Sequence, residues 1–146
     1  MPEMTLVNLR LSAMNLLARR EFTRKELSRK LGYLTNDSGL IDEALNRLEA
    51  EGLLSNHRFV ETFIRSRLNR GHGPVRIRQD LRQKGCDDDA ISVALEETEV
   101  DWFELAESTR QKKFGEAAPS EPKEKARQIR FLQYRGFPAG VVMELF

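Results

Sequence analysis

The chain has 146 residues, of which 40% are hydrophobic and 32% are charged, a balance that excludes both a mostly disordered chain and a membrane protein. The net charge is only +1, and the single cysteine, Cys86, cannot form an internal disulfide, which is typical of a cytoplasmic protein. No apolar run approaches the roughly 18 residues that a spanning helix requires. Residues 1–10 lack a basic start followed by an apolar block, so we expect no secretory signal.

Glycines and prolines divide the chain into stretches rich in Leu, Ala, Glu, Arg and Lys, which favour helices, and no strand or hairpin pattern occurs. Residues 23–26 (TRKE) predict a capping box, with Gly32 as the left-handed stop of that helix. Pro74 suits the first position of a helix, and residues 87–89 (DDD) place negative charge at a helix start. The predicted helices cover about 5–20, 23–32, 37–52, 56–70, 74–85, a stretch from 87 onward, 101–114, 123–135 and a stretch from 138 onward, with a loop at 115–122.

The predicted helices repeat along the chain as a long helix, a tight turn and a short helix, with a third helix in the first two copies. The third copy lacks that last helix, and the helix at 101–114 is interpreted as an insertion before it. These patterns predict an all-α fold, an elongated, curved array of tandem three-helix repeats with about nine helices. We place the repeats at 1–55, 56–100 and 101–146. The matched positions are Thr23, Gly73 and Phe137; Leu27, Ile77 and Val141; and Leu31, Leu81 and Leu145.

Charge is distributed in blocks, and the block at 57–85 carries eight basic and two acidic residues. Seven of the eight are arginines, whose guanidinium groups favour bidentate pairing with carboxylate or phosphate. Two short helices meeting at a stiff turn would bring these side chains together. The alternative is a solvated face that pairs with the acidic residues of 87–107. The predicted binding residues are Arg65, Arg67, Arg70, Arg76, Arg78 and Lys84, and the turn-setting residues are Gly71, Gly73 and Pro74.

Few residues suggest chemistry. His57 and Glu61 lie four residues apart, but a metal site needs at least three ligands and no further His or Cys pattern supplies one. We therefore predict neither a metal site nor a cofactor nor catalytic residues. We interpret His72 as an exposed turn residue and Cys86 as a small apolar packing residue. The aromatic residues occur at helical spacing among aliphatic ones and are assigned to the core: Phe59, Phe63, Trp102, Phe103 and Phe131.

Five segments, in order along the chain, resemble the RecX family. They are 13–31 (AxxLLARRxxTxxELxxKL), 48–60 (LxxxGLLSNxRFV), 65–85 (RSRxxxGxGPxRIRQxLxxKG), 112–115 (KKFG) and 125–137 (KARQxRFLxxRGF). Pro138 and Gly140 depart from the family pattern in the last helix, where better helix formers are usual. The resemblance covers nearly the whole chain.

This resemblance implies a cytosolic bacterial regulator of the RecA recombinase, without chemistry of its own. Such proteins are bent modules of three-helix repeats that lodge in the groove of the RecA–DNA filament and block its extension and ATP-dependent activities. The implied partner is the RecA filament on single-stranded DNA, with weak direct DNA contact and no small-molecule substrate.

The alternative function is a winged-helix-like DNA-binding transcriptional regulator, with residues 23–31 as the recognition helix. Residues 45–54 resemble the end of such a domain, but no strand-forming wing follows Leu54. A hydrolase or transferase is a more distant alternative.

Overall fold

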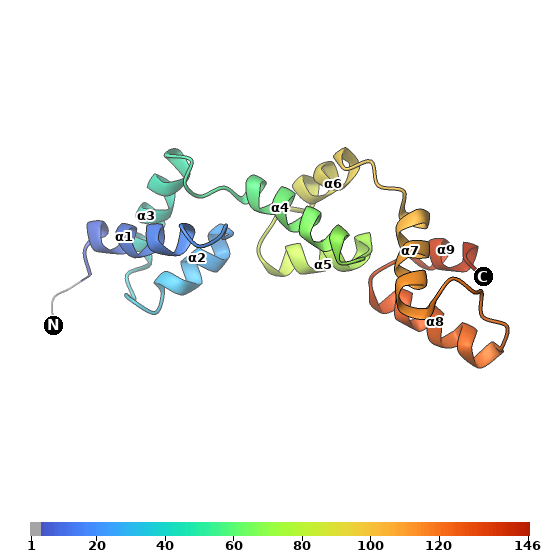
Figure 1. The fold of residues 1–146 in the computed structure, drawn as a ribbon. Coiled ribbons are helices and arrows are strands. Elements are labelled where there is room, and N and C mark those ends of the chain that lie inside the picture. The colour runs from blue at the N-terminus through green and yellow to red at the C-terminus, as the bar shows by residue number, and fades with distance from the viewer. Residues whose placement is uncertain (1–3) are drawn as a thin grey trace. The chain divides into compact units, whose positions relative to one another are not determined.

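The computed structural model describes residues 4–146, and over this range it contains nine α-helices and no strand (Figure 1). The all-helical prediction is therefore confirmed, and no wing follows Leu54, because α4 begins two residues later. None of the helices in this range is both long and apolar enough to cross a membrane. The helices are α1 (Leu6–Leu17), α2 (Arg24–Leu31), α3 (Ser38–Ala50), α4 (Asn56–Asn69), α5 (Pro74–Gln83), α6 (Asp88–Glu97), α7 (Trp102–Phe114), α8 (Pro122–Tyr134) and α9 (Ala139–Glu144).

The chain divides into two compact units, and the first comprises Met1–Val60 with Gln83–Cys86. Helices α1, α2 and α3 form its core through leucines and alanines at helical spacing, and Leu9, Leu27 and Leu45 are fully buried there. The predicted capping box is present: Thr23 Oγ1 accepts from the Glu26 N–H, and the Glu26 carboxylate accepts from the Thr23 N–H.

Two predicted helix ends in this unit are wrong. Helix α1 ends at Leu17 rather than near residue 20, because the side chains of residues 18–20 are exposed and give the helix no buried face there. Gly32 is not a left-handed stop, since its φ of −61° is right-handed. Gly52 does have the left-handed conformation, with φ of 75°, directly after α3 and its C-cap residue Glu51.

The second unit comprises Glu61–Arg82 with Asp87–Phe146. Ile77 and Leu81 of α5 and Ile91 of α6 are fully buried. Pro74 is the first residue of α5, as predicted, and the Asp87 carboxylate caps α6 by accepting from the Ala90 N–H at 3.4 Å.

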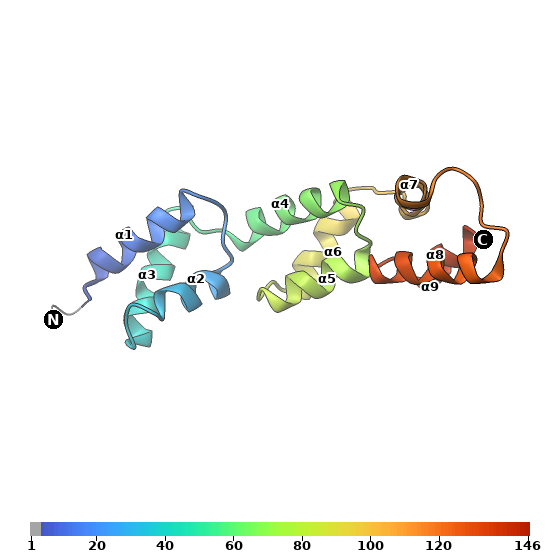
Figure 2. The same ribbon diagram turned by 60° about the horizontal axis from the view of Figure 1, so that its bottom comes forward.

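Helix α7 packs on both α8 and α9, which it crosses steeply (Figures 1 and 2). Ala106 of α7 shares a core with Leu132 and Val142, so the interpretation of 101–114 as an insertion is wrong. The third repeat match is also shifted by one residue. Pro138 occupies the N-cap position that Thr23 has in α2, which places Val142 rather than Val141 at the buried position matched to Leu27.

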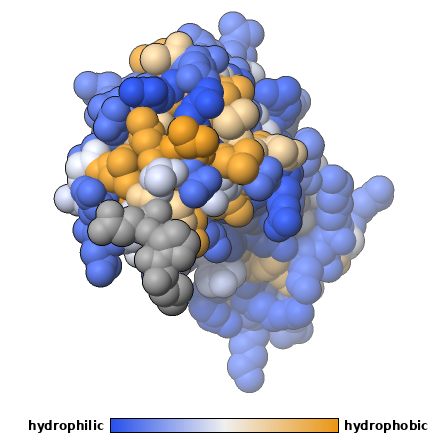
Figure 3. All heavy atoms as spheres, turned by 90° about the vertical axis from the view of Figure 1, so that its left-hand side faces the viewer, coloured by the Kyte–Doolittle hydropathy of each residue, from blue (hydrophilic) through white to orange (hydrophobic). Residues whose placement is uncertain are grey.

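Apolar side chains also reach the surface. Phe59 and Phe63 are buried as predicted, but Phe103 is 40% exposed and is not a core residue. Figure 3 shows apolar side chains gathered on one face of the N-terminal unit. The exposed apolar residues of this unit include Val7 and Leu11 of α1.

Candidate binding site at the Gly-His-Gly-Pro turn

The turn between α4 and α5, residues 71–74, is held by backbone hydrogen bonds on both sides. The His72 N–H donates to the Arg67 carbonyl at 3.0 Å, which closes the end of α4. The Gly73 N–H donates to the Arg135 carbonyl at 2.7 Å, and the Val75 N–H donates to the Gly136 carbonyl at 3.0 Å. The turn is therefore fixed against the turn that follows α8, some 63 residues later in the chain.

Two glycines make this close approach possible. A Cβ atom on Gly73 would lie 2.4 Å from the carbonyl oxygen of Gly136, and one on Gly136 would lie 2.3 Å from the Cβ of Arg76. Gly136 also has a φ of 95°, a backbone conformation that residues with a side chain rarely adopt. The sequence predicted a stiff bend at 71–74, and in the structure the backbone of residues 135–137 packs directly against this bend.

His72 is buried, with 8% exposure, so its interpretation as an exposed turn residue is wrong. Its Nδ1 atom has no hydrogen-bond partner among the described residues. Burial, followed by the positive charges of Arg76, Arg67 and Arg135, lowers the pKa of the imidazole to about 4. His72 is thus neutral at physiological pH, and three arginines lie close enough to disfavour its protonation.

The side chains around this turn form a surface that we call the cationic turn surface, made of Arg67, Arg70, Arg76 and Arg135. Burial, together with the charges of Arg70 and Arg76, lowers the pKa of the Arg67 guanidinium below its ordinary value. Three of these guanidinium groups lie over aromatic rings: Arg67 over Phe63 at 4.3 Å, Arg76 over Tyr134 at 5.2 Å and Arg135 over Phe131 at 4.7 Å. Stacking of this kind holds a guanidinium in a defined orientation.

Arg135 is the residue that the sequence did not place among the binding candidates. Its Nη1 atom donates to the Arg70 carbonyl at 2.8 Å, which joins two positions 65 residues apart. The available signal was the basic helix end, Tyr134-Arg135, that precedes the third turn just as Asn69-Arg70 precedes the second.

Two predicted arginines lie elsewhere in the same unit. Arg65 lines a separate pocket of about 460 Å³ together with Glu61 and Glu97. Arg78 donates from Nη1 to Ser92 Oγ of α6 at 2.9 Å. Convergence around the turn therefore holds for Arg67, Arg70 and Arg76.

The alternative of internal pairing with the acidic block applies to Arg82. Its guanidinium pairs with the Asp88 carboxylate at the start of α6. Pairing also occurs at Arg76, which lies 4.0 Å from Asp80 one helical turn away.

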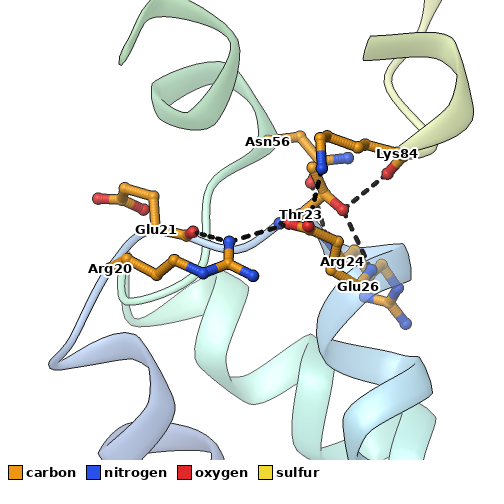
Figure 4. A network of polar contacts seen from close by, with 7 residues as sticks. All are labelled: Arg20, Glu21, Thr23, Arg24, Glu26, Asn56 and Lys84. Carbon is orange, nitrogen blue, oxygen red and sulfur yellow. Dashed lines mark hydrogen bonds and ion pairs between the residues drawn. The ribbon is translucent and has the colours of Figure 1, made fainter. Parts of the chain in front are cut away.

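Lys84 belongs to a polar network in the N-terminal unit (Figure 4). Its carbonyl accepts from Thr23 Oγ1 at 2.6 Å, and its Nζ lies 3.3 Å from the Glu26 carboxylate. Burial opposes ionisation of Glu26, but the hydrogen bonds from the Thr23 N–H and Arg20, with the charge of Lys84, together lower the pKa of this carboxyl. The Arg24 N–H donates to Asn56 Oδ1 at 2.8 Å in the same network. The structure thus gives Lys84 a role in holding α2 to the segment after α5.

Groups that could perform chemistry are sparse. No cluster of three or more His, Cys, Asp or Glu side chains that could hold a metal occurs within residues 4–146. Cys86 is buried, as expected for a packing residue, and burial, with the negative charge of Glu26, raises the pKa of its thiol. A thiol held protonated in this way is a poor nucleophile.

The folded chain is therefore a helical-repeat protein that presents arginines around a rigid turn. Sequence models of two RecX domains match it: the second three-helix domain at residues 55–95 and the third three-helix domain at residues 99–146. The chain is 49% identical over 131 residues to the "Regulatory protein RecX" of Halorhodospira halophila (strain DSM 244 / SL1), covering 90% of this chain and 81% of that protein. It is 48% identical over 141 residues to the protein of the same name from Pseudomonas entomophila (strain L48), covering 97% and 91%.

Solved structures show the same fold. The crystal structure of RecX from Lactobacillus salivarius superposes with a TM-score of 0.80 at 23% identity, covering 95% of this chain and 92% of that one. A second crystal structure, of regulatory protein RecX, gives a TM-score of 0.78 at 24% identity, covering 94% and 73%. The chain belongs to the RecX family.

Proposed function

We propose that this chain is a non-enzymatic regulator of the RecA recombinase, which binds in the groove of the RecA filament on single-stranded DNA and blocks filament extension. Inhibition of ATP hydrolysis and of strand exchange follows from that block. The names of its relatives support a regulatory role. We also propose the repeats 1–55, 56–100 and 101–146 as the modules that contact the filament, so that several weak contacts add their effects.

The observation that carries this proposal is the cationic turn surface. Arg67, Arg76 and Arg135 are oriented by stacking on aromatic rings, and Arg70 lies beside them at a turn that is fixed through the backbone. A rigid array of guanidinium groups loses little conformational freedom on binding, and it is complementary to carboxylates and to phosphates. A filament of protein and DNA offers both kinds of anion along its groove.

The test is the ATPase rate of a RecA–single-stranded DNA filament titrated with the purified chain. We expect inhibition at substoichiometric amounts, because blocking a filament end affects many subunits. Neutralising the surface by Arg67→Gln with Arg76→Gln should weaken the inhibition at least tenfold in concentration, corresponding to about 1.4 kcal/mol.

A matched control is Arg127→Gln with Arg130→Gln, two exposed arginines of α8. It removes the same charge from the same unit and should inhibit as the parent does, and circular dichroism should show equal helicity in all three proteins. No inhibition by the parent at equimolar amounts would refute the proposed function. An equal loss of inhibition in both double variants would show that inhibition depends on total charge rather than on this surface.

A further inference from the structure

A pocket of about 250 Å³ adjoins the cationic turn surface within the C-terminal unit. It is bordered by the end of α4, the last turns of α7 and the end of α8, which meet near the α4–α5 turn (Figures 1 and 2). Its lining includes two arginines, two lysines and two hydroxyl residues. They are Arg70, Arg135, Lys112, Lys113, Ser108 and Thr109.

The charge of this pocket has one sign. Four of its lining residues are basic and none is acidic. A different pocket is lined by the acidic residues of α7 and its N-cap, Asp101, Glu104 and Glu107, and by no basic residue. Lys112 and Lys113 also suit the C-terminal end of α7, where positive charge is favourable, but that preference does not require two arginines from α4 and α8 beside them.

The walls of the pocket are held in place. The Arg135 guanidinium donates to the Arg70 carbonyl and lies over the Phe131 ring, and these two contacts fix its position. A Cβ on Gly71 would lie 2.6 Å from Thr109 Oγ1, so the turn and α7 are in direct contact at the base of the pocket. Arg135 is thus presented by a preformed wall, beside the exposed side chains of Arg70, Lys112 and Lys113.

We propose that this pocket binds a phosphodiester group of single-stranded DNA, an inference that rests on the proposed function for its setting in the RecA–DNA filament. Ser108 Oγ and Thr109 Oγ1 donate to the Leu105 carbonyl, so the donors left for a ligand are the four cationic side chains. Contacts made by cations alone recognise charge and carry no base information, which is how proteins contact a nucleic-acid backbone.

The size of the pocket favours a group on a polymer over a free nucleotide. Its volume of about 250 Å³ lies below the roughly 300–1,000 Å³ of sites that enclose a whole small molecule. A single backbone phosphate fills less space and leaves its neighbours outside. A phosphodiester carries one negative charge, as a carboxylate does, but a DNA strand places a further phosphate at every nucleotide beside these four cations.

The experiment compares Lys112→Gln with Lys113→Gln against a matched control, Lys123→Gln with Lys125→Gln, which removes two exposed lysines of α8 that do not line the pocket. Binding of a fluorescent oligothymidylate is measured by anisotropy at several salt concentrations. The pocket variant should bind at least about fivefold more weakly, and its salt slope should be smaller by about 0.7 for each phosphate that it no longer neutralises. The control should bind as the parent does.

Three further ligands identify the kind of anion that the pocket binds. A methylphosphonate oligothymidylate, which lacks backbone charge, should bind the parent and the pocket variant equally weakly. Inorganic phosphate at millimolar concentration should displace the oligonucleotide only weakly. Efficient displacement by phosphate would identify a small-anion site and overturn the proposal, as would tighter, lysine-dependent binding of polyglutamate.

The result is separable from the proposed function. Equal DNA affinity of the pocket and control variants would overturn the pocket assignment, even if the parent inhibits the recombinase. A parent that fails to inhibit the recombinase but binds DNA through Lys112 and Lys113 would refute the regulatory function and leave the phosphate site in place.

Discussion

Replacing Gly73 by alanine tests whether the turn at 71–74 depends on backbone contact with residues 135–137. The new Cβ would lie 2.4 to 2.5 Å from backbone atoms of Gly136 and Phe137, which cannot move aside as a side chain would. Separating the two turns costs about 1–3 kcal/mol for the overpacked contact. It also breaks the hydrogen bonds of the Gly73 and Val75 N–H groups, at about 0.5–1.5 kcal/mol each.

The expected loss is therefore about 2–6 kcal/mol in the free energy of unfolding, measured by urea denaturation with circular dichroism. Gly140→Ala is the matched control, because a Cβ at Gly140 meets nothing within 4 Å and the residue lies inside α9. That variant should be unchanged or stabilised by up to about 1 kcal/mol through helix propensity. A Gly73→Ala protein as stable as the parent would refute the role given to this close approach.

Three further predictions concern buried side chains. Leu27→Ala should lower the free energy of unfolding by about 2–5 kcal/mol in urea denaturation, because Leu27 is fully buried. His72 has a pKa of about 4 in the folded chain, against about 6.5 in the unfolded chain. The free energy of unfolding should therefore fall by about 3 kcal/mol between pH 6.5 and pH 4. His72→Gln should make the free energy of unfolding less dependent on pH over this range. Arg110→Met should cost about 3 kcal/mol at pH 7, because the nearly buried guanidinium pairs with Glu107 and donates to two loop carbonyls. Pairing with Arg110 lowers the pKa of Glu107 below the ordinary carboxyl value of 4.5. The stability difference between Arg110→Met and the parent should therefore become smaller when the pH falls below 4.5.

Local signals in the sequence predicted local structure well. The capping box at Thr23, the helix start at Pro74 and the acidic helix start at residues 87–89 each depend on residues within one turn of helix, and all three are present. The match in α9 was shifted because a proline can occupy either the N-cap or the first helical position, and Pro138 is the N-cap residue in the structure.

Long-range features were not predictable in this way. The burial of His72 and the joining of Arg135 to Arg70 require two turns, far apart in sequence, to pack against each other. The role of α7 was missed for a related reason: repeat matching compares similar sequences, whereas α7 fills the place of a third helix with a different sequence. Charge type and spacing did predict that Arg67, Arg70 and Arg76 gather, but not that Arg65 and Arg78 lie near α6 residues.

Crowding of cations gives the free protein an unfavourable interaction that an anion removes. The pKa of Arg67 is lowered by burial and by the charges of Arg70 and Arg76, so its charged form is disfavoured where it lies. Binding sites often keep such locally unfavourable arrangements because the ligand needs them. Arg67→Met removes the charge, and a flexible thioether can maintain the contact with the Phe63 ring.

Arg67→Met should therefore be at least as stable as the parent in its free energy of unfolding, while inhibiting the recombinase less. Sulfate should stabilise the parent more than the variant, since the anion relieves a repulsion that the variant lacks; urea midpoints with and without sulfate measure the difference. Arg47→Met, on an exposed arginine paired with Glu43, is the control and should leave the sulfate effect intact. A variant that is less stable than the parent would show that Arg67 is held mainly by its stacking on Phe63, and that electrostatic repulsion does not dominate in the cluster.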